Sequence, residues 1–275
     1  MMHDIDLTPD LHQRFCDALT RASGIRLGEN KRTLVETRLR KRVQELGMAD
    51  TTAYMGWVFQ RDNLAAEMPV IINLLTTNKT DFFREPAHYD YLRTRVLPAH
   101  LGGETFTFWS AASATGEEAY SAAMLMAEHF HGAPAYTILG SDISQNVLSR
   151  ARKGVYYANQ LRDIPAHLAD KYIVRGKNAK GHEVFRITAD LREHVRFAPM
   201  NLMLDSYPVY RGFHAVFLRN VLIYFDEAVQ RQVIGRIVNH IRPGGYLFVG
   251  HSETMQVRDP RLIQCASAIY RKEQG

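Results

Sequence analysis

Hydrogen-bonding side chains crowd the segment TTNKTDFFRE, residues 76–85. Two threonines, an asparagine, a lysine and an aspartate stand before two phenylalanines, an arginine and a glutamate, and the segment follows the apolar run VIINLL, residues 70–75. So many polar groups directly after an apolar run are unusual both for a plain loop and for a helix. Side chains of these types can hold a ligand through hydrogen bonds, and we expect the segment to line a cofactor site.

A second polar segment, WSAASATGEEAYS, covers residues 109–121. Small side chains from Ser110 to Gly116 would let a ligand approach the backbone, and the start of the following helix would offer free N–H groups. The segment lacks the GxGxxG pattern of dinucleotide sites. Glu117 and Glu118 stand in the first helical turn instead, where they would repel a phosphate but not a cation. Acids are also favourable at any helix N-terminus, so both interpretations remain open.

Further polar groups follow predicted strands. Asp142 ends the run YTILGSD, at the place where an acid commonly binds ribose hydroxyls, although it could instead cap the next helix. Asn220 and Tyr224 follow the run FHAVFL, but a tyrosine among aliphatic residues more often belongs to the core. The pair Asn201-Leu202 follows VRFAPM and could be an ordinary turn. Groups for an adenosine and a positive centre, without a phosphate loop, indicate S-adenosylmethionine as the ligand.

The elements that would position these groups form an α/β pattern after residue 100. The sequence predicts strands at 106–109, 136–139, 213–218, 246–249 and 265–270, and helices at 115–130, 144–153 and 227–241. Ser144 is the expected N-cap of the second helix, and Pro243 is expected to follow the end of the third. Strands alternating with helices predict parallel βαβ units in a doubly wound sheet, which binds ligands at the carboxyl ends of its strands.

The chain before residue 76 is predicted to be helical, at residues 10–22, 31–46 and 50–75, the last as two short helices broken at Pro69. The middle helix carries six basic residues beside its apolar stripe: Lys31, Arg32, Arg38, Arg40, Lys41 and Arg42. These side chains could be solvated, or they could form a docking surface for an acidic macromolecule. The sequence therefore predicts two domains, residues 1–75 and 76–275.

Composition narrows the class of protein. A chain of 275 residues with 46% hydrophobic residues can bury a full core, and its net charge of +5 permits an acidic partner without requiring one. Cys16 and Cys265 have no metal-type spacing, and we expect reduced thiols and no metal. No basic-then-apolar leader and no apolar run of about 18 residues are present, so we expect a cytoplasmic protein without membrane insertion.

Six segments together resemble one enzyme family. TTNKTDFFRE, WSAASATGEEAYS, GSDIS, FAPMNL, FLRNVLIYFD and PGGYLFVGHSE occur in this order along the chain. They are similar to the segments of the chemotaxis-receptor protein-glutamate O-methyltransferases, the CheR family. The resemblance covers nearly the whole chain, including the basic helical part. It implies a Rossmann-like S-adenosylmethionine-dependent methyltransferase sheet with an all-α N-terminal domain and a small inserted β subdomain.

The resemblance also implies the site residues. The first segment would contact the methyl donor through Asn78, Thr80 and Arg84, with Phe82 and Phe83 anchored in the core. Glu118 and Asp142 would hold the adenosine portion, chiefly its ribose. The adenine and methionine sides would be lined by the two pairs Asn201-Leu202 and Asn220-Val221. Arg84 and Tyr224 would lie closest to the transferred methyl group, as the candidate catalytic residues. Separately from the resemblance, opposite charge would favour encounter with receptor helices that carry glutamates, so we expect Lys31, Arg32, Arg38 and Arg42 to face the cytoplasmic helices of the receptors, with the enzyme recruited to membrane-bound receptor arrays.

The implied chemistry does not require a general base. A glutamate side chain with an ordinary pKa of about 4.3 is already ionised at pH 7. The enzyme therefore mainly aligns a carboxylate with a sulfonium methyl, and positioning of this kind can contribute roughly 7–11 kcal/mol. A strong fixed ion pair to the carboxylate would stabilise the ground state more than the transition state, so Arg84 is expected to position rather than clamp it. The product would be S-adenosyl-L-homocysteine.

Residues 159–195 interrupt the βα alternation with the strand-like pieces YIVR and EVFRIT. In the family this position holds the β subdomain, which in some members grips a receptor C-terminal tail peptide by strand addition. The turn RGKNAKGHE between these pieces differs in length and composition from that of relatives, so the sequence leaves open whether a tail peptide binds here.

Two rival functions remain open. A nucleic-acid methyltransferase would agree with the basic helix, but none of the ten prolines is followed by proline or cysteine, as the common motifs of that class require. We therefore expect no nucleic-acid partner. The other rival is a non-catalytic adaptor that binds S-adenosylmethionine, against which the intact Arg84, Asn220 and Tyr224 argue.

Overall fold

The computed structural model describes residues 9–27, 31–100, 103–130 and 136–274. The chain forms two compact units. One extends to Thr77 and includes Tyr224–Val229, and the other comprises Asn78–Ile223 and the chain from Gln230 onward. The predicted domain border between residues 75 and 76 lies close to this division and stays a prediction.

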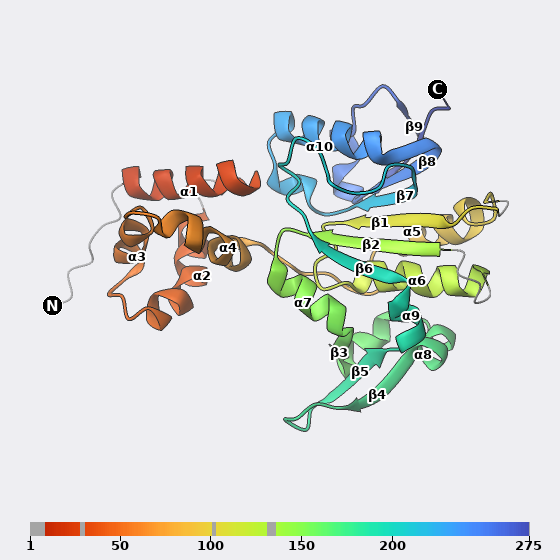
Figure 1. Ribbon diagram of the computed structural model, residues 1–275, viewed down its shortest axis with the longest axis horizontal. Coiled ribbons are helices and arrows are strands. Elements are labelled where there is room, and N and C mark those ends of the chain that lie inside the picture. Colours follow the sequence, from red (N-terminus) through yellow and green to blue (C-terminus); the bar gives the residue numbers. More distant parts are fainter. Residues whose placement is uncertain (1–8, 28–30, 101–102, 131–135, 275) are drawn as a thin grey trace. The chain divides into compact units, whose positions relative to one another are not determined.

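The described part of the first unit is helical (Figure 1). Its helices are α1 Pro9–Ser23, α2 Arg32–Glu45, α3 Thr51–Val58 and α4 Asn63–Leu75. The predicted helices at 10–22 and 31–46 are confirmed. The predicted break at Pro69 is wrong, because Pro69 lies inside α4 and the break falls before it, where Arg61 has a φ of 50°. A proline inside a helix costs about 3 kcal/mol, and burial of Ile71, Ile72 and Leu75 on α4 offsets this cost.

The second unit is built on one large sheet. In chain order its elements are α5 Pro86–Tyr91, the π-helical turn η2 Leu92–Val96, β1 Phe106–Ala111, α6 Glu117–Phe130, β2 Tyr136–Asp142, α7 Gln145–Lys153, β3 Val155–Tyr157, the 3₁₀ turn η3 Ala158–Asp163, α8 Ala166–Tyr172, β4 Ile173–Lys177, β5 Glu183–Ile187, α9 Ala189–Glu193, β6 Val195–Pro199, β7 Phe213–Leu218, the 3₁₀ turn η4 Leu222–Tyr224, α10 Glu227–His240, β8 Ile241–Val249, the 3₁₀ turn η5 His251–Gln256, β9 Leu262–Ala266 and β10 Ile269–Lys272.

The seven strands of the large sheet follow the order β6-β2-β1-β7-β8-β10-β9. The pairs from β6 to β8 are parallel, as predicted, whereas β10 pairs antiparallel with β8 and with β9. The single strand predicted at 265–270 is wrong. Residues 262–272 form a hairpin instead, because Ala268 adopts a φ of 59° and reverses the chain.

The boundary between α10 and β8 also differs from the prediction. The helix ends at His240 and the strand begins at the next residue, so Pro243 lies within β8 rather than after a helix. The pairing of β8 with β7 shifts its register between Phe213 and Ala215, and such an irregularity is where a strand accommodates a proline.

Alternating side chains of β1 define the two faces of the sheet. Phe106 and Phe108 belong to the main apolar cluster with residues of α6 and η2. Trp109 points the other way and meets Tyr207 and His240, the last residue of α10. Figure 1 accordingly shows α6 and α10 on opposite faces of the sheet. This arrangement confirms the predicted α/β fold, with a doubly wound, mostly parallel sheet.

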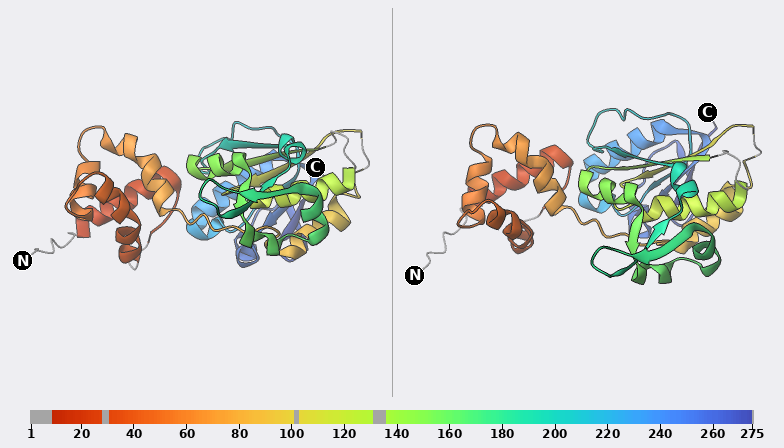
Figure 2. Two further views of the ribbon diagram at one scale, coloured as in Figure 1. Left: turned by 90° about the horizontal axis from the view of Figure 1, so that it is seen from below. Right: turned by 60° about the horizontal axis from the view of Figure 1, so that its bottom comes forward.

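The inserted segment forms a separate three-stranded antiparallel sheet in the order β3-β5-β4 (Figure 2). It confirms the predicted small β subdomain, although β3 begins at Val155, before the expected start. Strand β4 is an edge strand whose residues Val174–Lys177 are exposed. In the part of the chain that the structure describes, no helix is long and apolar enough to cross a bilayer.

Candidate active site

Four neighbouring parallel strands end at one rim of the large sheet. Ala111 at the end of β1 pairs with Ser141 of β2 on one side and with Leu218 of β7 on the other, and Asp142 pairs with Pro199 of β6. The segments that follow these strand ends therefore share the rim. They contain the predicted site residues Glu118, Asp142, Asn201, Leu202, Asn220 and Val221.

The loop after β1 has a strained backbone. Ala112, Ala114 and Gly116 have φ angles of 67°, 46° and 94°, in the left-handed region that costs an alanine about 1–2 kcal/mol. Backbone strain of this kind gathers at ligand sites, where surrounding structure holds it in place. The hydroxyl of Ser113 in the same loop is buried and has no hydrogen-bond partner among the described residues.

Asp142 joins this loop to the end of β2. Its Oδ2 accepts a hydrogen bond from the N–H of Ala114 at 2.9 Å, and its Oδ1 accepts one from the N–H of Ser144 at 2.9 Å. Burial raises the pKa of Asp142, and the backbone N–H donors oppose this shift. Each carboxylate oxygen keeps capacity for a second donor, so Asp142 can still accept the hydroxyls of a ribose. Ser144 caps α7 as predicted, accepting from the N–H of Val147.

Glu118 is paired with a buried arginine that the sequence analysis did not select. Its Oε2 lies 2.8 Å from Nε of Arg219, and its Oε1 accepts from the hydroxyl of Ser110 at 2.7 Å. Nη1 of Arg219 donates to the carbonyl of Arg84 at 2.8 Å and faces Nδ1 of His88 at 3.0 Å. The available signal for Arg219 was its position directly after the strand FHAVFL, beside Asn220.

The neighbouring acid, Glu117, also has partners inside the protein. Its carboxylate accepts from the hydroxyl of Thr115 at 2.6 Å and from the amide of Gln160 at 3.1 Å. Burial raises the pKa of Glu117, and these hydrogen bonds oppose the shift. Because the charge of Glu118 is balanced by Arg219, the two acids attract an external cation less than the sequence alone suggested.

Glu253 organises the turn that carries Asn220. Its two carboxylate oxygens accept hydrogen bonds from the N–H groups of Asn220, Leu222 and Gly250, at 2.7, 2.8 and 2.7 Å. Asn220 has a φ of 57°, and its side-chain amide lies 3.4 Å from Oε1 of Glu85. Glu253 thus fixes an asparagine in a left-handed conformation at the rim, next to the polar segment 78–85.

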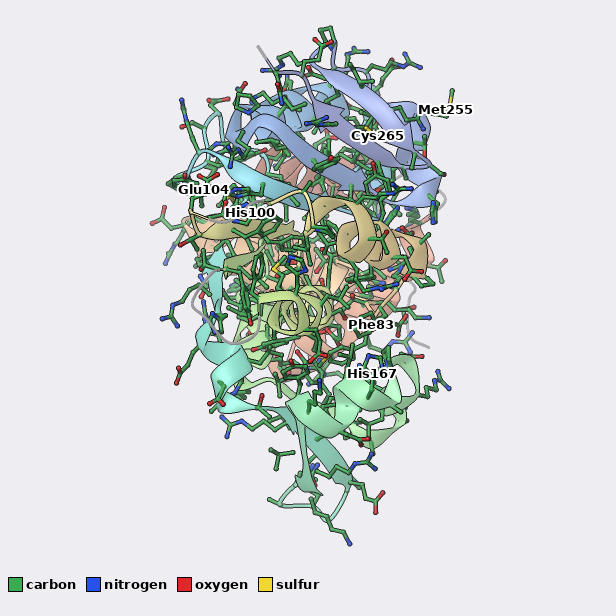
Figure 3. All side chains as sticks on the ribbon, turned by 90° about the vertical axis from the view of Figure 1, so that its right-hand side faces the viewer. Phe83, His100, Glu104, His167, Met255 and Cys265 are labelled. Carbon is green, nitrogen blue, oxygen red and sulfur yellow. The ribbon has the colours of Figure 1, made fainter. Side chains whose placement is uncertain are left out.

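The polar segment lines a large hollow of about 870 Å³ in the second unit. Lys79 and Arg84 line it from one side, and residues of η3 and α8, including His167, line it from the other. Figure 3 shows Phe83 and His167, which both line this hollow, on the same side of the molecule. A guanidinium nitrogen of Arg84 donates to the carbonyl of Lys79 at 3.2 Å, so the side chain folds back over its own segment.

The two phenylalanines of the segment behave differently. Phe82 is buried in the main apolar cluster, whereas Phe83 is half-buried and packs against it. The N–H of Phe83 donates to the hydroxyl of Ser121 on α6, which fixes the segment to the sheet domain. Asn78 and Thr80 are half-buried. Their contact with the donor stays a prediction.

The remaining rim candidates have local structural partners. Oδ1 of Asn201 accepts from the N–H of Met203 at 2.9 Å, the geometry of an asparagine turn, and Leu202 is buried. Val221 is half-buried. Tyr224 ends η4, belongs with the first unit, and its carbonyl accepts from the N–H of Arg26. The assigned roles of these residues stay predictions.

Two of the four basic residues proposed for partner binding hold the helical unit together. Arg38 donates to the carbonyls of Leu75 and Thr76, at the end of α4, at 2.7 and 2.9 Å. Nε of Arg42 lies 2.6 Å from the buried Glu67 in an ion pair. Lys31 is exposed, and Arg32 is half-buried and bonded to Glu36.

Among the described residues, two clusters of histidine and glutamate side chains bring possible metal ligands close together. They are Glu85, His88 and His251, and His100, Glu104 and His214, each with ligand atoms within 4.8 Å of one another. Each cluster also contains an arginine. Nη1 of Arg219 lies 3.0 Å from Nδ1 of His88, and Nη1 of Arg242 lies 2.6 Å from Nε2 of His214. A guanidinium at that distance repels a metal ion. The expected absence of a metal stays a prediction.

The hydrogen-bonding groups at the rim suit S-adenosylmethionine as a ligand. The unpartnered Ser113 hydroxyl, the free acceptor capacity of Asp142 and the amide of Asn220 offer neutral and anionic groups. These groups match ribose hydroxyls, an adenine edge and a sulfonium centre, and none of them requires a phosphate.

Comparisons with known proteins also indicate a methyltransferase that binds S-adenosylmethionine. Residues 78–270 match the family model described as CheR methyltransferase, SAM binding domain, and residues 11–76 match the CheR methyltransferase all-alpha domain. The chain is 36% identical to a chemotaxis protein methyltransferase of Escherichia coli over 95% of this chain and 90% of that protein. It is 38% identical to the one of Salmonella typhimurium over 89% of this chain and 84% of that protein.

Proposed function

This chain belongs to the CheR methyltransferase family, and we propose that it transfers a methyl group from S-adenosyl-L-methionine to glutamate side chains of chemotaxis receptors. The products are glutamyl methyl esters and S-adenosyl-L-homocysteine, and the reaction serves sensory adaptation. The observation that carries the proposal is the shared rim of four parallel strands, where Asp142, Asn201 and Asn220 stand at the ends of β2, β6 and β7.

The rim residues hold the donor in this proposal. Asp142 accepts the ribose hydroxyls, supported by Glu118. The pairs Asn201-Leu202 and Asn220-Val221 line the adenine and methionine sides, and Asn78, Thr80 and Arg84 form the wall made by the polar segment. When bound, the donor supplies an electrophilic methyl group on a positively charged sulfur.

The chain's own residues act by orientation. The acceptor glutamate is ionised at neutral pH, so no side chain has to remove a proton. Arg84 is half-buried and keeps one guanidinium bond to the carbonyl of Lys79, so its remaining donors can orient a carboxylate without a rigid bidentate clamp. Tyr224 contributes a hydroxyl that orients the acceptor or the methionine end of the donor.

The basic helix α2 is the receptor-facing surface in this proposal. Receptor helices that present glutamates carry negative charge, and opposite charge favours encounter. Lys31 is exposed and can take this role directly, whereas Arg32 would act from its pair with Glu36. Arg38 and Arg42 also serve the fold of the helical unit, so the exposed Arg40 on the same helix provides a cleaner test of docking.

The open edge of β4 is the proposed site for a receptor C-terminal tail peptide. Its residues Val174–Lys177 are exposed, and Val174 keeps 60% of its surface accessible. An exposed edge strand has unpaired backbone groups that can pair with an extended peptide. Such pairing would recruit the enzyme to membrane-bound receptor arrays.

Radiolabelled methyl transfer tests the proposed function. Receptor cytoplasmic fragments should acquire label that is released as methanol in base, the signature of an ester. Fragments with glutamine at the methylated positions are the matched control and should stay unlabelled. Labelling of DNA or RNA instead would favour the nucleic-acid alternative. Donor binding by calorimetry without turnover on any receptor would favour the adaptor alternative.

A further inference from the structure

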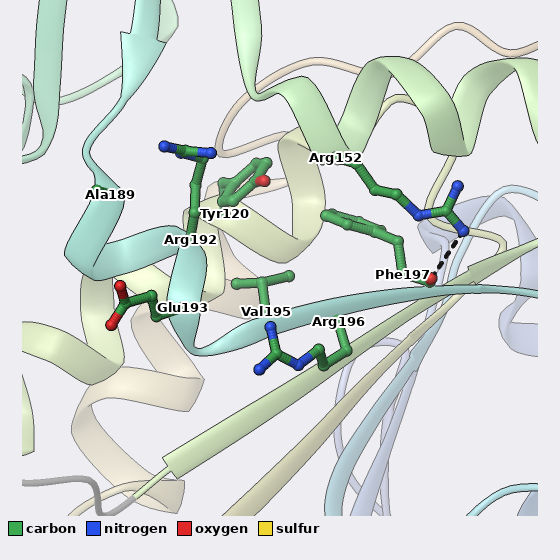
Figure 4. A pocket seen from close by; sticks show the side chains of 8 residues that line it. All are labelled: Tyr120, Arg152, Ala189, Arg192, Glu193, Val195, Arg196 and Phe197. Atoms are coloured by element: carbon green, nitrogen blue, oxygen red, sulfur yellow. Dashed lines mark hydrogen bonds between the residues drawn. The ribbon is translucent and has the colours of Figure 1, made fainter.

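A second hollow, of about 400 Å³, is lined by none of the residues assigned to the donor. Figure 4 shows the side chains that line it. Three arginines line it from three different elements: Arg152 on α7, Arg192 on α9 and Arg196 on β6. Glu193 is the only acid among the described residues of its lining. The balance of the lining side chains is therefore strongly positive.

The protein itself provides hydrogen-bond acceptors for only some of the guanidinium N–H groups of these arginines. Arg152 donates to the carbonyl of Phe197 at 2.9 Å, and Nε of Arg192 donates to the carbonyl of Ile187 at 3.1 Å. Arg196 is held in the β2–β6 ladder by its backbone, but within the described ranges its guanidinium forms no hydrogen bond or ion pair, and Glu193 forms no ion pair with any arginine. Most of the guanidinium donors around the hollow thus remain available to a ligand.

The floor of the hollow is aromatic. Tyr120 and Phe197 line it, with ring centroids 5.6 Å apart, and the apolar side chain of Val195 adds to the lining. Burial raises the pKa of Tyr120 to about 12, while the positive charges of Arg192 and Arg186 act in the opposite direction. The positive field of the arginines therefore reaches the base of the hollow.

We propose that this hollow binds the phosphate group of a small phosphorylated molecule. A phosphate monoester carries about −1.5 to −2 charge at pH 7 and three acceptor oxygens, which matches three guanidinium forks against one acid better than a single carboxylate would. The volume exceeds that of a phosphate group alone and lies within the range of small-molecule sites, about 300–1,000 Å³. The aromatic floor would contact the organic part of the ligand.

The residues that line this hollow are distinct from those assigned to the methyl donor. S-Adenosylmethionine has no phosphate, and none of the residues assigned to it lines this hollow. Binding can therefore be measured without donor, receptor or turnover. Failure of the methyl-transfer test would leave this proposal standing, and the reverse also holds.

Isothermal titration at low ionic strength tests the proposal. The full chain is titrated with uridine monophosphate, glucose 6-phosphate and inorganic phosphate, and with uridine and glucose as uncharged counterparts. We expect binding of the phosphorylated compounds alone, weakened by added salt. Tighter binding of uridine monophosphate than of the other two would identify a nucleotide as the source of the phosphate. Equal binding of all three would identify recognition of the phosphate alone.

Variants locate the binding to the hollow. Arg196→Gln should weaken binding about tenfold or more, the effect of losing a charge-assisted hydrogen bond, while Arg196→Lys should give a smaller loss because it keeps the charge. Arg192→Gln provides a second, independent test. Arg211→Gln, at an exposed arginine outside the lining, is the matched control and should bind as the unmodified chain does. Absence of binding at millimolar concentrations, or equal affinity of Arg196→Gln and Arg211→Gln, would overturn the proposal.

Discussion

Arg219 and Glu118 form a buried ion pair at the sheet rim, with Nε and Oε2 2.8 Å apart, although 101 positions separate them in the chain. The side chains retain 2% and 10% of their surface. The pair links the end of β7 to the first turn of α6, beside the strained loop after β1. It therefore supports the rim on which the proposed donor site depends.

Removal of one partner of this pair should be strongly destabilising. An unpaired buried charge typically costs about 3–5 kcal/mol, so Arg219→Met and Glu118→Leu should each lower the free energy of unfolding by that order. The double variant should recover part of the loss, because neither Arg219 nor Glu118 is left charged without its partner, although Glu85 still loses its 3.8 Å ion pair with Arg219. Urea unfolding of the three variants measures this coupling. Additive losses in the double variant would show that the pair does not act as a unit.

His88 should make stability depend on pH. Burial, with the charges of Arg219 and His251, lowers the pKa of His88 from 6.5 to about 3. Between these values the unfolded chain binds a proton that the folded chain does not, so stability should fall as pH drops below about 6.5. The contribution of this residue approaches about 1.4 kcal/mol per pH unit.

The variant His88→Asn should remove this contribution, and His182→Asn, at an exposed histidine, should retain it. Unfolding free energies at several pH values between 4 and 7 provide the comparison. Equal slopes for His88→Asn and the unmodified chain would show that His88 remains neutral in both states or charges in both.

The pair of Arg42 and Glu67 should control the stability of the helical unit. Glu67 is 4% exposed and also accepts from the hydroxyl of Tyr54 at 3.0 Å. Arg42→Glu would place a second acid beside Glu67 and should cost about 3 kcal/mol or more. Arg40→Glu, at an exposed position on the same helix, should cost less than about 0.5 kcal/mol.

The same two variants separate folding from receptor docking. If α2 binds receptors, Arg40→Glu should lower receptor methylation while circular dichroism and donor affinity remain unchanged. A normal methylation rate for Arg40→Glu would remove this helix face from the proposed interface.

Asp142 should be essential for donor affinity. Loss of two hydrogen bonds to its carboxylate, each worth about 1.5–3 kcal/mol, predicts that Asp142→Ala weakens binding of S-adenosylmethionine at least a hundredfold. Asp170→Ala, at an exposed acid on α8, is the control and should bind normally. Calorimetric titration measures both, and unchanged affinity of Asp142→Ala would contradict the proposed donor site.

Gly140 should tolerate no side chain. A Cβ at this position would lie 2.5 Å from two ring atoms of Phe197, closer than real contacts allow. Gly140→Ala should therefore cost about 1–3 kcal/mol through displaced packing next to the rim. By contrast, Gly176→Ala should be nearly neutral in packing terms, because a Cβ there meets nothing within 4 Å. Thermal unfolding of both variants tests the difference.

The sequence alone determined the local elements and the rim candidates. Alternating apolar runs and small-residue turns predicted most helices and parallel strands, and the positions after strand ends selected Asp142 and Asn220, because parallel strands bring their carboxyl ends to one edge. It misplaced the break at Pro69 and merged β9 with β10. Helix packing overrode the proline, and a left-handed alanine gave no compositional signal.

Only the tertiary structure decided which charges meet. Glu118 was predicted to face a ligand, and the fold pairs it with Arg219; Arg42 was predicted to face a partner, and the fold pairs it with Glu67. Periodicity reveals which residues are buried on one element, but not which residue from a distant element lies opposite. The partner of a buried charge is set by long-range packing, and the local sequence therefore does not encode it.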